Sequence, residues 1–418
     1  MTRPPPLRSD CFALPGGARL TPVDAALGRL REVLGPVAGT ESVALFDAAG
    51  RTVARDVAAL RDNPPAANSA VDGYAVRAAD TEAAGVLPLA EGRAAAGAPH
   101  GARVPAGHAL RILTGAVMPA GTDAVIMDEE VVLEGARIRF EGRVRAGANV
   151  RPAAEDMAAG QVILPAGTVI GPQHLAVLAA AGHGQVEVRK RLRVAVLSTG
   201  DEVVAPGSPL RPGQIHDANR PMLLALAARW GHEVLDLGHV PDDPERIRAR
   251  LDDAAARADV ILSSGGASAG DADHVSALMR KAGEVAFWRI AMKPGRPLAL
   301  GFWRDRLFLG LPGNPVAAFV TALVFARPAL ARLAGGHWPE PLAVEVPAAF
   351  HKEKRPGRRE FLRGRLRPDG RVEAFRSEGS GLVSGLGWAN GLIELGDDAA
   401  AIEPGTPVRF LPYAGFGL

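Results

Sequence analysis

The feature of this sequence that most constrains its fold is a regular alternation of β-rich and helical segments across residues 191–336. Residues 192–197 predict a strand that ends in Ser198-Thr199-Gly200, and a helix follows with Asn219 as its expected N-cap. The order then repeats: strand 232–237, helix 244–257, strand 259–263, helix 272–282 and strand 285–290. Such alternation is typical of βαβ units in a parallel sheet, where ligands bind at the carboxyl ends of the strands.

The segments outside this alternation predict further domains. Residues 298–302 and 306–311 indicate a hairpin or two adjacent strands, and a helix beginning near Pro315 completes a doubly wound unit. Short apolar pieces in Gly-, Ala- and Pro-rich sequence before this unit, and a hairpin turn at Pro368-Asp369-Gly370 after it, indicate β structure. We expect an α/β multidomain protein with four parts: a linker domain (20–60 plus 150–185), an inserted β domain (61–149), an α/β domain (186–336) and a C-terminal β domain (337–418).

Charge and cysteine content exclude several functional classes. The 48 basic and 46 acidic residues leave a net charge of +2, without the concentrated basic face of a nucleic-acid-binding protein. The single cysteine, Cys11, excludes an internal disulfide and cysteine-based zinc or iron–sulfur sites. No apolar run reaches the roughly 20 residues that span a bilayer, and residues 316–326 predict a buried helix. These features, with no apolar signal segment, favour a cytoplasmic protein and no membrane partner.

A run of small residues at 263–270, Ser-Ser-Gly-Gly-Ala-Ser-Ala-Gly, follows one predicted strand and precedes a helix. Converging backbone N–H groups at such a turn can bind an anion, although an ordinary tight βα turn has the same composition. Asp271 and Asp273 favour a phosphate with a divalent cation, and helix capping is the alternative for either acid.

Acids follow other strands of the same expected sheet. Asp201 and Glu202 lie just after the first strand, where they could face the same crevice or form a solvated turn. In Asp242-Asp243-Pro244, capping explains Asp243 better than Asp242, because Pro244 favours the first helical position.

Two Pro/Gly loops complete the candidate site in the α/β domain. Lys293-Pro294-Gly295-Arg296-Pro297 offers two cations to an anion, or a solvated surface loop. Only five of the 48 basic residues are lysines, which makes Lys293 notable. Leu311-Pro312-Gly313-Asn314-Pro315 could shape a ligand wall or only turn the chain, with Asn314 as helix cap.

Outside the sheet, Asp72 stands in a glycine turn beside Tyr74, and Thr114 follows a short strand. From composition alone, both segments are interpreted as structural turns. The ten histidines are scattered without metal-binding spacing, and we expect His216 and His274 to be polar surface residues.

Six short motifs stand in this order along the chain: 68–75 (NSAVDGYA), 111–116 (RILTGA), 198–202 (STGDE), 264–270 (SGGASAG), 293–297 (KPGRP) and 311–316 (LPGNPV). Each alone is weakly specific. Together they resemble those of the molybdopterin molybdenumtransferase family, the molybdenum insertases related to the gephyrin E domain, and the resemblance covers nearly the whole chain. It implies a molybdopterin-binding type of α/β domain and a barrel-like C-terminal domain.

The resemblance implies insertion of molybdenum from molybdate into adenylylated molybdopterin, with Mg²⁺-dependent cleavage of the phosphoanhydride and release of AMP. The residues it assigns to catalysis are Asp72, Thr114, Glu202, Asp242, Asp273 and Lys293. Those it assigns to the metal are Asp72, Glu202, Asp242 and Asp273, with Asp271 a further candidate. Those it assigns to the molybdopterin substrate are Ser264, Gly265, Gly266, Ser268, Gly270, Arg296, Pro312, Gly313, Asn314 and Pro315. Molybdate contacts are expected from Arg358, Arg363, Ser380 and Ser384.

The family's active site lies between two subunits, which implies a homodimer in which Asp72 and Thr114 complete the neighbour's site. Molybdopterin adenylyltransferase and molybdoenzyme chaperones are the protein partners that the resemblance implies. Departures from the family pattern are Ala267 and Ala269, where larger apolar residues are expected, and Arg289, where lysine is frequent.

Two other functions fit the same fold. A molybdopterin adenylyltransferase would use ATP, but the large domains at 61–149 and 341–418 argue against it. A non-catalytic scaffold is the other alternative, and the intact set of acids and small residues counts against it.

Overall fold

The structure is a computed structural model that describes residues 20–82, 85–265, 274–282, 285–295 and 297–418. The chain folds into two compact units. Of the described residues, one unit comprises those up to Glu41 together with those of Gly50–Ala54 and Arg189–Leu418, and the other comprises those of Ser42–Ala49 and Arg55–Val188. Each unit has its own cores, whereas the finer division into four domains stays a prediction.

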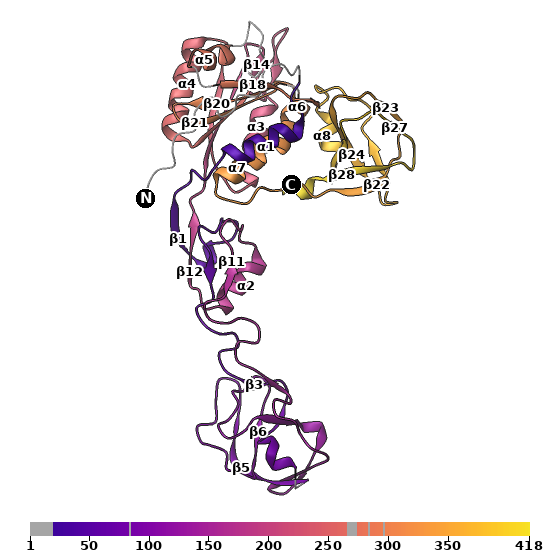
Figure 1. Cartoon of the computed structure of the whole chain (residues 1–418). Helices are drawn as coiled ribbons and strands as arrows, with labels where there is room; N and C mark the ends of the chain where they lie inside the picture. Colours follow the sequence, from indigo (N-terminus) through magenta and orange to yellow (C-terminus); the bar gives the residue numbers. More distant parts are fainter. Residues whose placement is uncertain (1–19, 83–84, 266–273, 283–284, 296) are drawn as a thin grey trace. The chain divides into compact units, whose positions relative to one another are not determined.

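A six-stranded sheet forms the centre of the first unit (Figure 1). Its strands, in spatial order, are β16 (Glu233–Val240), β13 (Arg193–Thr199), β17 (Val260–Ser264), β21 (Arg306–Leu311), β20 (Pro297–Trp303) and β18 (Val285–Arg289). The first four run parallel, as the alternation predicts. β20 is antiparallel to both of its neighbours, so the sheet is mixed and not wholly parallel. The reason is local: Arg304 and Asp305 both have positive φ, as a two-residue hairpin turn requires.

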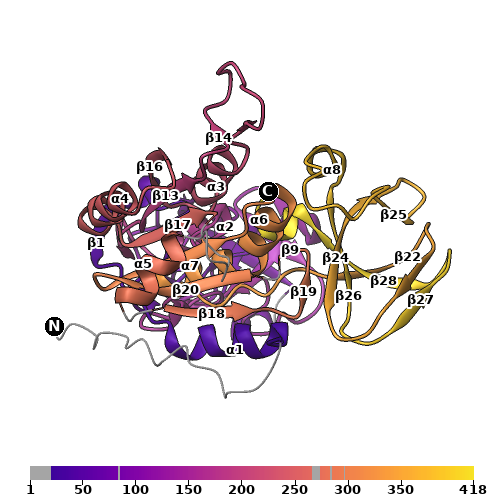
Figure 2. The same cartoon turned by 90° about the horizontal axis from the view of Figure 1, so that it is seen from above.

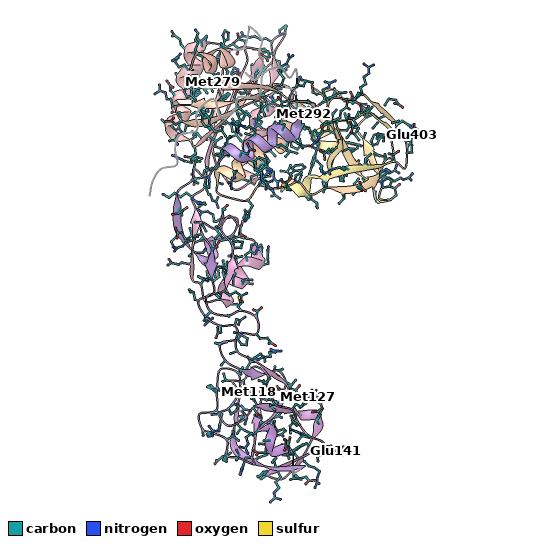
Figure 3. All side chains as sticks on the ribbon, viewed as in Figure 1. Met118, Met127, Glu141, Met279, Met292 and Glu403 are labelled. Atoms are coloured by element: carbon teal, nitrogen blue, oxygen red, sulfur yellow. The ribbon has the colours of Figure 1, made fainter. Side chains whose placement is uncertain are left out.

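Helices cover both faces of this sheet, which confirms the doubly wound arrangement (Figure 2). Val194 and Val196 of β13 face one core, while the alternate residues Ala195 and Leu197 face the other. The first core is covered by α1 (Val23–Val33), α3 (Asn219–Arg229), α6 (Pro315–Thr321), a π-helical turn (Ala322–Ala326) and α7 (Arg327–Leu333). The second is covered by α4 (Pro244–Arg257) and α5 (His274–Ala282). Met292 belongs to the first core and Met279 to the second (Figure 3).

The apolar stretch near residue 320 is a buried helix, as expected from the sequence. Pro315–Leu333 is long and apolar enough to cross a membrane, but 78% of its apolar window is buried inside the protein. Helices in the cores of soluble proteins have these same properties.

A second sheet in the first unit brings the Lys293 loop to the C-terminal part of the chain. Its strands, in spatial order, are β19 (Met292–Lys293), β24 (Arg359–Leu366), β26 (Gly391–Leu395), β28 (Pro407–Pro412) and β22 (Val344–Pro347), with β25 (Val372–Ala374) paired to β24. The predicted hairpin around Asp369 is therefore present as β24 and β25. Lys293 pairs with Glu360 at the edge of this sheet.

The second unit is built around a third six-stranded sheet, within the predicted β domain. Its strands, in spatial order, are β7 (Ala124–Met127), β4 (Gly73–Val76), β6 (Ala109–Ile112), β5 (Val86–Ala94), β9 (Arg137–Phe140) and β8 (Val131–Glu134). Tyr74 and Val76 face one core, and Ala75 faces the other. The same unit contains α2 (Pro172–Ala180) and the paired strands β2 (Val57–Ala58) and β11 (Val162–Leu164).

Candidate functional site

Asp72 and Thr114, which are 42 residues apart in sequence, are hydrogen-bonded to each other in the second unit. Asp72 Oδ1 accepts from both the backbone N–H and the hydroxyl of Thr114, each over 2.7 Å. The Thr114 backbone N–H, followed by its hydroxyl and by the charge of Arg111, lowers the pKa of Asp72. Both side chains are exposed. The two residues are therefore in direct contact, and the lowered pKa favours the carboxylate form of Asp72.

The position of Asp72 depends on the glycine that follows it. A Cβ on Gly73 would lie 1.9 Å from the carbonyl oxygen of Ile126, since β4 and β7 approach closely there. Only glycine fits this approach, so packing against β7 requires a glycine directly after Asp72.

The carboxyl ends of four adjacent strands bring the other predicted acids to one edge of the central sheet. Glu202 follows β13 and Asp242 follows β16, while Gly265 follows β17 and Pro312 follows β21. Hydrogen bonds join these strand ends. The Asp242 N–H donates to Asp201 Oδ1 over 3.1 Å, and the Gly265 N–H donates to the Leu311 carbonyl over 3.2 Å.

The acids at this edge have different roles. Asp243 accepts from the backbone N–H groups of Glu245 and Arg246, which confirms that it caps α4. The carboxylates of Glu202 and Asp242 accept no hydrogen bond from the described residues. No cluster of three metal-binding side chains occurs among the described residues. Two carboxylates nevertheless suit Mg²⁺, which keeps several waters and takes only one or two protein carboxylates.

Asn219, which the sequence predicts as a helix N-cap, has a different role in the structure. It is the first residue of α3, not its N-cap. Its Nδ2 donates to Ser264 Oγ over 2.7 Å and to the Gly313 carbonyl over 2.6 Å. The capping contact comes instead from Asp217, whose Oδ1 accepts from the Arg220 N–H. Asparagine is common both at caps and in buried polar contacts, so sequence alone gave no signal to separate the two.

Several of the predicted substrate-binding residues surround Asn219. Ser264 is buried at the end of β17, and Gly265 has a φ of +89°. Pro315 opens α6 and Asn314 takes its N-cap position, but the Asn314 side chain makes no capping hydrogen bond. Other predicted residues, and two of the departures from the family pattern, lie outside the described residues: Gly266, Ala267, Ser268, Ala269, Gly270, Asp271, Asp273 and Arg296. The third departure, Arg289, is the exposed last residue of β18.

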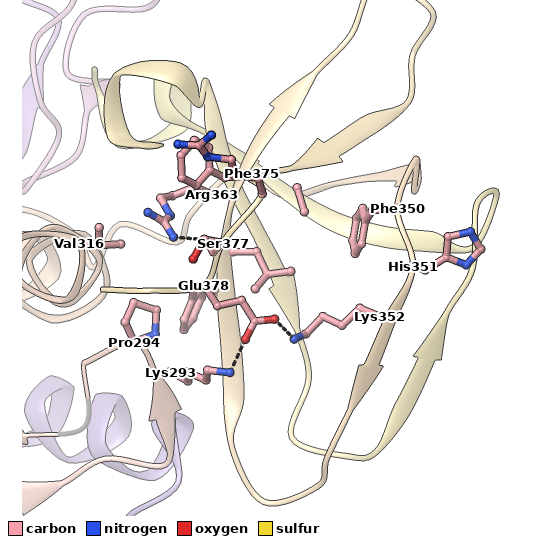
Figure 4. Close-up of a pocket in the computed structure, with 14 residues that line it drawn as sticks. Lys293, Pro294, Val316, Phe350, His351, Lys352, Arg363, Phe375, Ser377 and Glu378 are labelled. Carbon is pink, nitrogen blue, oxygen red and sulfur yellow. Dashed lines mark hydrogen bonds and ion pairs between the residues drawn. The ribbon is translucent and has the colours of Figure 1, made fainter. Parts of the chain in front are cut away.

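Lys293 belongs to a second cluster, in a cavity of about 280 Å³ beside the C-terminal sheet (Figure 4). Its Nζ is ion-paired with Glu378 and lies 3.8 Å from Glu360 Oε1. Lys352 also pairs with Glu378, and its Nζ lies 2.9 Å from Glu360 Oε2. Lys352, Glu360 and Glu378 were not singled out in the sequence, because nothing local in their segments marks them as neighbours of Lys293.

The contacts within the cluster favour the charged forms of Glu378 and Lys352. Burial raises the pKa of Glu378, but hydrogen bonds from Lys293 and Lys352 outweigh burial, and the net pKa is lowered. Burial lowers the pKa of Lys352, but hydrogen bonds to Glu378 and Glu360 outweigh burial and raise it. Two ammonium groups and two carboxylates thus form a locally neutral network.

The four residues expected to contact molybdate lie at different places in the first unit, and one of them lines the same cavity. Arg363 lines the cavity, but its guanidinium donates to the carbonyls of Ser377, Gly379 and Leu382 and lies 4.7 Å from the Phe375 ring centre. It therefore anchors the segment 377–382 in this conformation. The Ser380 carbonyl accepts from the Val316 N–H, and Ser384 is the exposed first residue of α8 (Ser384–Trp388). Arg358 is half-buried. A direct role in molybdate binding stays a prediction for all four.

The doubly wound sheet defines a multidomain α/β protein, and several of the predicted site residues lie at the carboxyl edge of its central sheet. Three family models match the chain along most of its length. They are the MoeA N-terminal region (domain I and II) at residues 21–182, the probable molybdopterin binding domain at 195–332, and the MoeA C-terminal region (domain IV) at 345–413.

Full-length relatives agree with these matches. The chain is 38% identical over 397 residues to the molybdopterin molybdenumtransferase of Haemophilus influenzae, covering 94% of this chain and 98% of that protein. It is 36% identical to that of Nostoc sp., covering 89% and 88%. The solved structure of a molybdopterin biosynthesis MoeA protein from Pyrococcus horikoshii OT3 matches with a TM-score of 0.81 and 30% identity, covering 94% of this chain and all of that one. The chain belongs to the MoeA family of molybdenum-cofactor enzymes.

Proposed function

We propose that this protein is a molybdopterin molybdenumtransferase that inserts molybdenum from molybdate into adenylylated molybdopterin, cleaves the phosphoanhydride and releases AMP. The observation that carries the proposal is the placement of Glu202, Asp242 and the Gly265 turn at the ends of adjacent parallel strands. The names of the relatives support the same reaction.

The residues of this chain would contribute mainly by positioning and by electrostatic stabilisation. Ser264 and Gly265 begin the turn whose N–H groups would face the pyrophosphate. Glu202 and Asp242 would hold Mg²⁺, which when bound offsets the charge that develops on the phosphate oxygens. No covalent nucleophile is required, because preorganised charges and donors can stabilise the transition state.

Asp72 and Thr114 require a different explanation, since they belong to the other compact unit. We propose that the active enzyme is a homodimer in which this pair completes the site of the neighbouring subunit. The exposure of both side chains and the lowered pKa of Asp72 support this role, because an ionised carboxylate is available at the surface. A cytoplasmic location, with molybdopterin adenylyltransferase and molybdoenzyme chaperones as protein partners, belongs to the same proposal.

The reaction can be tested with purified protein, adenylylated molybdopterin, Mg²⁺ and molybdate, with AMP release as the readout. We expect Asp72→Ala and Glu202→Ala to slow AMP release at least about 100-fold, since each removes charge from the reacting groups. Asp243→Asn is the matched control for Asp242→Asn, because Asp243 caps α4. Absence of AMP release by the parent protein would exclude the proposed reaction. Consumption of ATP with unmodified molybdopterin would indicate an adenylyltransferase instead.

A further inference from the structure

In the cavity around Lys293, the carboxylate of Glu378 is ion-paired with both lysines of the cluster, Lys293 and Lys352. Glu378 uses one carboxylate oxygen for Lys293 and the other for Lys352, so the single side chain bridges two ammonium groups (Figure 4). A tetrahedral oxyanion bound between two lysines would make contacts of the same kind. The carboxylate of Glu378 thus lies where such an oxyanion would bind to the two ammonium groups.

The two acids of the cluster differ in how firmly they are held. Glu360 lies within β24, between strands β19 and β26, and its side chain is only 8% exposed. Glu378 lies in a loop before Gly379, and its side chain is 39% exposed. Glu360 therefore stays beside the lysines, whereas Glu378 can turn toward solvent at little cost in packing.

The backbone of this loop is fixed even though the Glu378 side chain is exposed. Arg363 donates to the carbonyls of Ser377 and Gly379 on either side of Glu378, and the Ser380 carbonyl accepts from Val316. Arg363 is 3% exposed and packs against Phe375. Departure of the carboxylate thus requires only side-chain rotation, with no movement of the loop itself.

We infer that Glu378 is an internal competitor for the anion site of this cavity, and that Lys352 is a second cation of that site beside Lys293. An incoming dianion displaces the Glu378 carboxylate and takes over its contacts with both lysines. The displaced state leaves two lysines and Glu360, a net positive charge that favours a doubly charged ligand over a singly charged one. At about 280 Å³ the cavity has room for a tetrahedral anion and several waters, each of which takes about 30 Å³.

The inference deepens the proposed function, on which it rests for the biological identity of the anion. Molybdate and the phosphate of the pterin substrate share the chemistry of a tetrahedral dianion, and either could be the ligand. Two further basic side chains line the cavity, and each has another neighbour: Arg376 lies 5.9 Å from the Phe375 ring centre, and His351 lies beside Glu403.

Direct binding tests the inference without any need for turnover. Full-length protein is dialysed to equilibrium against sodium molybdate or inorganic phosphate at constant ionic strength, and the bound anion is measured by elemental analysis. We expect Glu378→Gln to bind at least one of the two anions about tenfold more tightly than the parent, because the competing charge is gone. Lys352→Gln in the Glu378→Gln background is expected to remove this gain.

Glu373→Gln is the matched control, since Glu373 is also 39% exposed and is paired with a single cation, Arg367. Its anion affinity is expected to equal that of the parent. Circular dichroism identifies any variant that fails to fold, and Glu378→Asp, which shortens the side chain by one methylene, then replaces Glu378→Gln with the same expected direction. Equal or weaker binding of both anions by the folded variant would overturn the inference.

The outcome is separable from that of the proposed function. Unchanged anion affinity in Glu378→Gln together with normal AMP release would refute the role of Glu378 and leave the reaction intact. Tighter anion binding without AMP release by the parent would establish the competition and refute the reaction.

Discussion

Asn219 Nδ2 lies 2.7 Å from Ser264 Oγ and thereby joins the start of α3 to the end of β17. The same amide nitrogen reaches the Gly313 carbonyl over 2.6 Å. One buried side chain thus joins the end of β17 to the Pro/Gly loop that follows β21. Both segments belong to the proposed site, and Asn219 fixes the distance between them.

Replacement of Asn219 should therefore lower both stability and activity. We expect Asn219→Ala to lower the free energy of unfolding by about 1–3 kcal/mol, because the hydrogen bonds to Ser264 and Gly313 are both lost, at about 0.5–1.5 kcal/mol each. AMP release should fall as well, with KM rising more than kcat falls if the loops mainly hold substrate. Urea denaturation measures the free energy of unfolding, and steady-state kinetics measure kcat and KM.

A double-mutant cycle with Ser264→Ala isolates the contact itself. The two substitutions should be non-additive by about 0.5–1 kcal/mol, since each removes the same hydrogen bond. Strict additivity would show that Asn219 acts through Gly313 alone.

The close approach of β4 and β7 leads to a prediction for the second unit. Gly73→Ala would place a methyl group 1.9 Å from the Ile126 carbonyl oxygen, a distance that requires the backbone to move. We expect a loss of at least about 3 kcal/mol, the upper end of the usual cost of overpacking. Thermal denaturation checks the prediction, and Gly101→Ala, with no atom within 4 Å of the added Cβ, should stay within about 0.5 kcal/mol of the parent.

The sequence predicted local features well and distant contacts poorly. Helix α4 begins and ends at the expected residues because Asp243 and Pro244 are start signals read from neighbours in the chain. Asn219 contacts Ser264 and Gly313, 45 and 94 residues away, and no local pattern encodes such contacts. Lys293 was expected beside the anion turn of the central sheet. Residues 266–270 of that turn lie outside the described residues, so this expectation stays a prediction. The ion pairs of Lys293 with Glu360 and Glu378 had no signal in the sequence, because they depend on the pairing of β19 with the edge of the C-terminal sheet.

Substitutions of the adjacent acids Asp242 and Asp243 should have different effects, one on activity and the other on stability. Asp243→Ala removes the side chain that accepts from Glu245 and Arg246, and should lower the free energy of unfolding by about 1 kcal/mol. Asp242→Ala should leave stability within about 0.5 kcal/mol of the parent, as for a surface substitution, but reduce AMP release strongly. Denaturation and AMP release are measured on both variants. A loss of stability in Asp242→Ala together with a loss of activity in Asp243→Ala would contradict the two assignments.

His232 makes the stability of the first unit sensitive to acid. The residue is 9% exposed, and burial, followed by the charge of Arg191, lowers its pKa from 6.5 to about 4. The folded protein thus holds His232 neutral, while the unfolded chain binds a proton below pH 6.5. Above about pH 6.5 this histidine does not reduce the free energy of unfolding. As the pH falls from about 6.5 to about 4, it lowers the free energy of unfolding by up to about 3 kcal/mol. His232→Gln should flatten the unfolding free energy across this pH range, and His337→Gln, which alters an exposed histidine, should leave its slope unchanged. Urea denaturation at intervals between about pH 4 and 7 measures the slopes, and parallel curves for the parent and His232→Gln would contradict the assignment.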